Sequence, residues 1–170
     1  MLKAFDPLVV AAVAGSGGAS AYIDLRSRRV PNALTIAVAA LGLALAATGL
    51  GSQTLASSLG GFAAGLLLMM PGHVAGATGA GDVKLLAAIG TLLGPRGVFF
   101  AFLYTSIAGG ALALMVAMSR RRLSATVERT ARLLSSGGAN VNEIEHSTAD
   151  NRFAYAPAIA VGTLVAALGF

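Results

Sequence analysis

Apolar runs of close to twenty residues are the feature that most restricts how this chain can fold. They cover about 7–24, 33–51, 54–72, 83–94, 97–118 and 154–170. A helix of roughly 20 apolar residues crosses a bilayer, and a backbone in lipid must satisfy its own hydrogen bonds. The fourth run is short, so we expect it to be tilted, shielded by its neighbours or continuous with irregular backbone. We therefore predict an all-α, polytopic membrane protein with about six transmembrane helices.

Composition also favours a membrane protein. Hydrophobic residues make up 56% of the 170-residue chain and charged residues 11%, whereas a soluble domain has about 25% charged residues. We therefore predict that residues 1–170 form a single membrane-embedded domain. The lack of cysteine excludes disulfides, a thiol nucleophile and a cysteine-ligated zinc site. The two histidines, His73 and His146, lack metal-ligand spacing, so neither a metal nor another cofactor is predicted.

The distribution of basic residues predicts the topology. With six spans, the connections at 24–33, 72–84 and 119–153 lie on one side of the membrane. They contain ten of the twelve lysine and arginine residues, namely Arg26, Arg28, Arg29, Lys84, Arg120, Arg121, Arg122, Arg129, Arg132 and Arg152. The positive-inside rule therefore places these connections in the cytoplasm and both termini outside. Because this topology accounts for the basic residues, the predicted partner is membrane lipid and not nucleic acid.

Two segments allow more than one interpretation. In 120–134, apolar residues recur near helical spacing, which predicts a short amphipathic helix on the anionic inner leaflet. A solvated cluster of charges beside the membrane is the alternative, and the rest of 119–153 is typical of a polar linker. The first apolar run has the length of a cleavable signal peptide, but its positive cluster follows the run, so we expect a retained helix.

Two acidic residues, Asp24 and Asp82, stand apart from the others. Five of the seven acids lie in the N-terminal tail or the long polar connection, whereas these two lie where an apolar helix meets a cytoplasmic turn. Ionisable groups at membrane depth are costly and point to function. Each also has an ordinary structural explanation: Asp24 could pair with Arg28 one helical turn later, and Asp82 could cap a helix that begins at Val83.

The predicted topology brings both acids to the same face, and this favours a shared role. Two neighbouring carboxyl groups cannot both ionise easily, so they share a proton. The ionised group can take a proton from water while the protonated group polarises a carbonyl, which gives peptide hydrolysis without a metal. Gly79 and Gly81 precede Asp82 and permit close approach of a substrate strand or a second helix.

Two segments together resemble a known family. DLRSRRVPNALT (24–35) and GAGDVKLLAAIG (79–90) are similar to the two signature segments of the type IV prepilin peptidases, which are membrane aspartic proteases of the G-x-G-D class. The pattern is specific, because an aspartate six residues before VPN is followed about fifty residues later by G-x-G-D-V-K. The resemblance covers about 21–97, and YAPAIAVGTL (155–164) is similar to the family's final helix.

The resemblance implies a role for individual residues. Asp24 and Asp82 would be the catalytic aspartates, while Pro31 and Asn32 would shape the turn after the first catalytic helix. Lys84 would lie near the second acid, with the alternative that it only snorkels to the membrane edge. The substrate would be a pilin or pseudopilin precursor, and its leader peptide would be cut on the cytoplasmic side of the bacterial inner membrane.

The chain is most similar to the short single-domain members that serve Flp, or tight-adherence, pilus systems. Larger members carry an additional cytoplasmic segment with paired cysteines and methylate the new N-terminus. The present sequence has no cysteine and no such segment, so N-methyltransferase activity is not expected. Two alternatives from other classes stay open: a small ion-coupled transporter that uses the acids as a cation or proton site, and a non-catalytic pilus-assembly scaffold. No oligomeric state is predicted.

Overall fold

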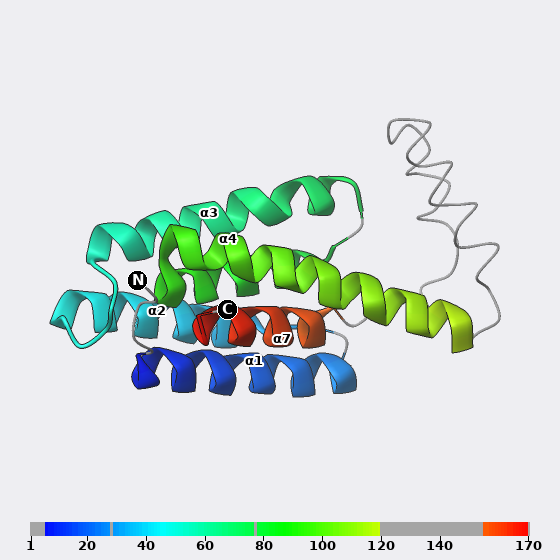
Figure 1. Cartoon of the computed structure of the whole chain (residues 1–170), viewed down its shortest axis with the longest axis horizontal. Coiled ribbons are helices and arrows are strands. Elements are labelled where there is room, and N and C mark those ends of the chain that lie inside the picture. The colour runs from blue at the N-terminus through cyan, green and yellow to red at the C-terminus, as the bar shows by residue number, and fades with distance from the viewer. Residues whose placement is uncertain (1–5, 28, 77, 120–154, 170) are drawn as a thin grey trace.

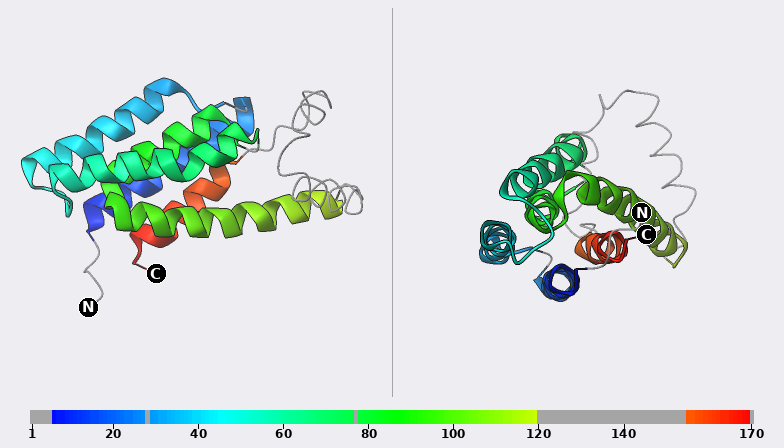
Figure 2. Two further views of the ribbon diagram at one scale, coloured as in Figure 1. Left: turned by 90° about the horizontal axis from the view of Figure 1, so that it is seen from above. Right: turned by 60° about the vertical axis from the view of Figure 1, so that its left-hand side comes forward.

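The computed structural model describes residues 6–27, 29–76, 78–119 and 155–169, which form a bundle of α-helices (Figure 1). The described residues contain α1 (Pro7–Ser27), α2 (Asn32–Thr48), α3 (Leu55–Val74), α4 (Ala80–Ser119) and α7 (Ala156–Ala167). Figure 2 shows the helices lying roughly along a common direction when the bundle is turned. The all-α prediction is confirmed for this part of the chain. The predicted interfacial helix at 120–134 and most of the connection 119–153 lie outside the described residues.

Helix α4 contains two of the predicted apolar runs. Gly94 interrupts its helical backbone, with φ 72° and ψ 177°, and Pro95 follows. A positive φ of this kind favours glycine, and a residue before proline avoids the helical region. The chain turns back at this position, so that 80–93 and 95–119 run in opposite directions (Figure 1).

The first half of α4 lies at the centre of the bundle. Leu85, Leu86 and Ile89 have no exposed surface, and almost every position from 82 to 94 is buried. This explains the short fourth apolar run, because a helix enclosed by protein does not have to match the bilayer thickness. Of the three explanations expected from the sequence, the structure therefore favours shielding by neighbours, together with the irregular backbone at Gly94.

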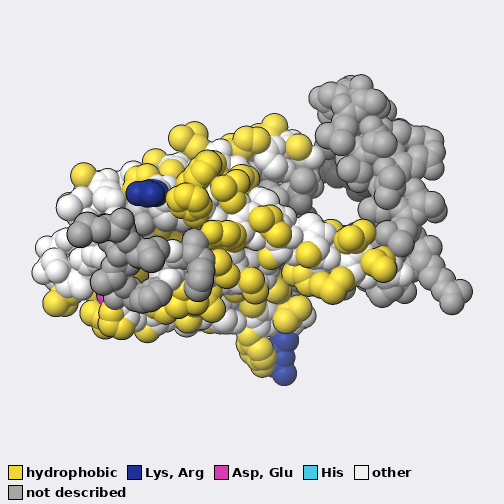
Figure 3. Space-filling view, viewed as in Figure 1, with side chains coloured by type: hydrophobic (Ala, Val, Ile, Leu, Met, Phe, Trp, Pro, Cys, Tyr) yellow, Lys and Arg dark blue, Asp and Glu magenta, His cyan; other side chains and the backbone are white. Residues whose placement is uncertain are grey.

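Three of the helices in the described part of the chain are long and apolar enough to cross a membrane. By length and composition they are α1, α3 and the Ala80–Met115 part of α4, which the turn at Gly94 divides into two antiparallel halves, whereas α2 and α7 are shorter apolar helices. The prediction of about six spans is therefore not confirmed. Large apolar side chains remain on the outside, with Leu67 71% and Ile107 70% exposed. Figure 3 shows hydrophobic side chains spread over the visible face, as expected of a surface that contacts lipid.

Glycines allow the helices to approach closely. A Cβ atom on Gly61 of α3 would overlap the backbone of Gly90 in α4, and a Cβ on Gly90 would overlap Gly61. On the other side of the bundle, Gly162 of α7 packs directly on Thr105 of α4. Helix pairs in lipid gain their stability from this kind of close backbone packing.

Candidate active site

Asp24 and Asp82 lie at the same end of the bundle. Asp24 belongs to the last turn of α1 and Asp82 to the first turn of α4. Their side chains are 5% and 9% exposed, and they are close enough for the negative charge of Asp24 to act on Asp82. The structure thus brings together two acids that are 58 positions apart in the sequence (82 − 24). It places them at helix ends and not in the middle of the bundle.

The Asp24 carboxylate has a backbone partner from a distant part of the chain. Its Oδ2 atom accepts a hydrogen bond of 3.2 Å from the backbone N–H of Ala156, the first residue of α7. The bond is buried, so it offsets part of the cost of removing this carboxylate from water. The alternative pairing with Arg28 stays a prediction, because residue 28 lies outside the described residues.

Asp82 has a capping role, but a different one from the role considered in the sequence. Helix α4 begins at Ala80 and not at Val83, so Asp82 is its third residue. From there Oδ2 accepts a hydrogen bond of 3.2 Å from the N–H of Gly79, which resembles the backward half of a capping box. The bond orients the carboxyl group and is compatible with a chemical role for the acid.

The glycines of the G-x-G-D segment lie where side chains would crowd the site. A Cβ on Gly79 would lie 3.2 Å from Oδ2 of Asp82, and a Cβ on Gly81 would lie 3.2 Å from Cβ of Val30. Gly81 therefore lets the start of α4 pack against the segment that follows α1. The close approach at Gly81 is therefore to the segment between α1 and α2, and not to a second helix as the sequence suggested.

A side-chain hydrogen bond connects the two signature segments, 24–35 and 79–90. Pro31 is the N-cap of α2, with φ −64° and ψ 138°, and its carbonyl accepts hydrogen bonds from the first turn of that helix. Lys84 Nζ donates a hydrogen bond of 3.0 Å to Oδ1 of Asn32. This hydrogen bond connects the start of α2 to the first turn of α4.

The coupling energy of the hydrogen bond between Lys84 and Asn32 can be measured directly. We expect Lys84→Met and Asn32→Ala each to lower the stability of the folded protein, and the double variant to lose less than the sum of the two. Because the bond is exposed, the coupling should be about 0.5–1 kcal/mol. Thermal unfolding in detergent over the double-mutant cycle gives this quantity. Strictly additive losses would show that the two side chains act independently.

Sequence reasoning did not assign a function to the start of α7. Ala156 is completely buried and donates to Asp24, and Tyr155 precedes it as the N-cap residue. Pro157 in the first turn is a recognisable signal of a helix start. It marks where the helix begins, but it does not reveal that this start meets an acid 132 positions earlier in the chain.

These features define a class of protein: a helical bundle with long apolar helices that carries two adjacent, buried carboxyl groups at one end. Comparison with family models gives the assignment within that class. Residues 11–114 match the model of the type IV leader peptidase family, which is more than half of the chain, so the chain belongs to this family. The match contains both acids and confirms the resemblance seen in the sequence. No curated protein and no solved structure matches the chain.

Proposed function

We propose that this chain is a membrane aspartic endopeptidase that removes the leader peptide of Flp-type prepilins or pseudopilins. Membership of a leader peptidase family makes a peptide the substrate. The observation that carries the aspartic mechanism is the meeting of Asp24 and Asp82 as two buried, electrostatically interacting carboxyl groups. The basic residues of the sequence favour cleavage at the cytoplasmic face of the inner membrane.

The proposed reaction uses the unequal protonation of the pair. The ionised carboxylate takes a proton from a water molecule, and the oxygen of that water attacks the scissile carbonyl carbon. The protonated carboxyl group hydrogen-bonds the carbonyl oxygen and supports the charge that develops there. When the tetrahedral intermediate breaks its C–N bond, the leaving nitrogen takes up a proton, and an acid and an amine are released. Neither a nucleophilic side chain nor a metal is required.

The position of the acids favours proteolysis over the transporter alternative. Ion-coupled transporters hold their sites near the bilayer midplane, between broken helices. Asp24 and Asp82 instead lie in the last turn of α1 and the first turn of α4. At such a position a site can receive an extended segment from the water side of the membrane.

Co-expression with a precursor tests the proposal. The full chain and an Flp-type prepilin precursor would be produced in a host without its own prepilin peptidase, and the pilin N-terminus would be measured by mass spectrometry. We expect removal of the leader without the added mass of a methyl group. An intact precursor would contradict the endopeptidase assignment, and pilus assembly from that intact precursor would support a scaffold. A methylated N-terminus would contradict the expected lack of methyltransferase activity.

Orientation can be tested separately, because the natural chain contains no cysteine. A single cysteine introduced at Ser27, beside Asp24, should react with a membrane-impermeant thiol reagent only after spheroplasts are opened. Labelling of intact spheroplasts would place this end of the bundle outside the cytoplasm.

The shared proton predicts a bell-shaped dependence of cleavage on pH. At low pH both carboxyl groups are protonated and no base is present, whereas at high pH both are ionised and no acid is present. The rate of precursor cleavage by the purified protein should therefore pass through a maximum and fall on both sides. A rate that stays constant over several pH units on either side would contradict catalysis by the pair.

A further inference from the structure

Helix α7 is the main packing partner of α1, the helix that carries Asp24. Helix α1, which carries Asp24, packs mainly against α7 and makes few contacts with α4, while α7 packs extensively against α4. Figure 1 shows α7 lying between α1 and the second half of α4. Helix α1 is therefore held against the rest of the bundle largely through α7.

The first turn of α7 contacts the site. Tyr155 has φ −90° and ψ −19°, and the N–H of the next residue, Ala156, donates to Asp24 Oδ2 at 3.2 Å. The Tyr155 ring packs onto Gly109 of α4. A Cβ on Gly109 would lie 2.5 Å from Cε2 and 2.9 Å from Cζ of this ring, so the ring fills the space that the missing side chain leaves.

We propose that Tyr155 is a positioning residue for the pair of acids, and this inference rests on the proposed endopeptidase function. Its ring packs on Gly109 and so fixes the position of the start of α7. This keeps the Ala156 N–H within hydrogen-bonding distance of Asp24. The N–H fixes the orientation of the Asp24 carboxyl group within the pair. A shift of the ring would therefore misorient this carboxyl group while the rest of the bundle stays folded.

Two neighbouring glycines provide a matched pair of variants. In Gly109→Ala the new methyl group would collide with the Tyr155 ring, whereas at Gly110 a Cβ meets nothing within 4 Å. With the purified full chain and an Flp-type prepilin precursor, we expect Gly109→Ala to lower kcat about ten-fold or more and to change KM less than two-fold. Gly110→Ala should leave both constants unchanged. Equal kcat values for the two variants, or a loss confined to KM, would overturn the proposal.

Variants of Tyr155 identify the ring as the acting group. Tyr155→Ala should lower kcat to a similar extent, and Tyr155→Phe, which keeps the ring, should restore most of the rate. In the Tyr155→Ala background the substitution Gly109→Ala should cause no further loss, because the ring it displaces is gone. A full additional loss in that background would contradict the proposed route through Tyr155.

Hydrogen–deuterium exchange measures the same contact without cleavage. We expect a peptide that contains Ala156 to take up deuterium several-fold faster in Gly109→Ala than in the natural chain or in Gly110→Ala. Asp24→Ala, which removes the acceptor, serves as the positive control. If the natural chain fails to cleave the precursor, the proposed function fails, and exchange alone decides the positioning role. Unchanged exchange in Gly109→Ala overturns that role whether or not the chain cleaves.

Discussion

Asp24→Asn and Asp82→Asn are each expected to abolish leader cleavage while the protein still inserts in the membrane. Asparagine keeps the shape of the side chain, but it neither accepts the proton of water nor donates one to the leaving group. Loss of general acid–base catalysis costs typically 10²–10⁴-fold in rate, so no mature pilin should form within the time of an assay. Conversion of a co-expressed precursor, followed by immunoblot and mass spectrometry, measures the effect.

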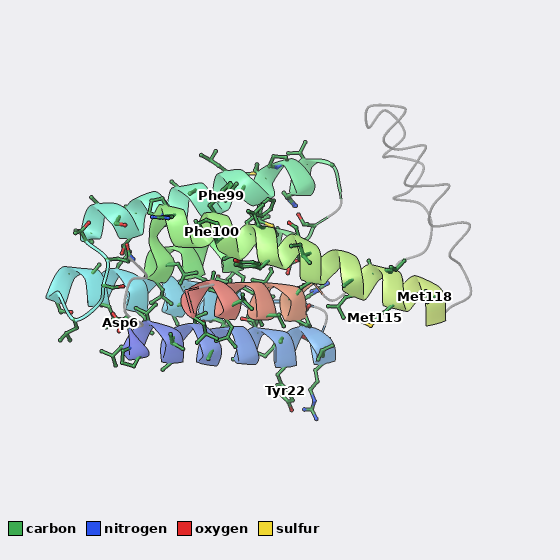
Figure 4. The ribbon with its side chains drawn as sticks, viewed as in Figure 1. Asp6, Tyr22, Phe99, Phe100, Met115 and Met118 are labelled. Atoms are coloured by element: carbon green, nitrogen blue, oxygen red, sulfur yellow. The ribbon has the colours of Figure 1, made fainter. Side chains whose placement is uncertain are left out.

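Asp6→Asn is the matched control. Asp6 lies at the opposite end of α1 from Tyr22, the labelled residue nearest Asp24 in the sequence (Figure 4). It accepts hydrogen bonds from the N–H groups of Leu8 and Val9, and asparagine is an equally good N-cap. We therefore expect normal cleavage by this variant. Normal cleavage by Asp24→Asn or Asp82→Asn would remove that residue from the mechanism.

Gly90→Ala and Gly61→Ala should cause the largest loss of stability. The added methyl group would overlap the facing backbone in α3 or α4, so the two helices must separate. Overpacking of a close contact costs typically about 1–3 kcal/mol. Any movement of α4 in this repacking also shifts Asp82, so activity should fall together with stability. The midpoint of thermal unfolding in detergent, followed by size-exclusion chromatography, is the measurement.

Gly18→Ala in α1 controls for the substitution itself. A Cβ at Gly18 meets nothing within 4 Å, and alanine is the better helix former. This variant should unfold at the same temperature as the natural chain or at a higher one. If Gly90→Ala and Gly61→Ala unfolded at the same temperature as Gly18→Ala, the close backbone contact between α3 and α4 would be contradicted.

The sequence predicted the parts of the structure that depend on local pattern. The apolar runs indicated the helices because a segment in lipid has few alternatives. Asp24 and Asp82 were recognised because a charge at the end of an apolar run is unusual. The predicted alternation of spans also sends both helix ends to one side, but the count of about six spans on which it rests is not confirmed.

Other features depend on contacts that no local pattern records. The N–H that binds Asp24 comes from Ala156, a residue without any polar side chain. The Tyr155 ring packs on one glycine among many in the chain, and only this packing distinguishes Gly109 from Gly110. The reversal of direction between the two predicted runs in α4 depends on the backbone at Gly94, whose positive φ the apolar pattern does not indicate.

The enclosure of 80–93 by other helices has a consequence for how the bilayer acts on this molecule. Thinner or thicker lipid acts first on segments that touch acyl chains, which tilt or shift to restore the match. The helix that bears Asp82 touches mostly protein, and a close-packed interior resists gradual deformation. We therefore expect the position of Asp82 to follow its protein neighbours and to stay the same in membranes of different lipid content.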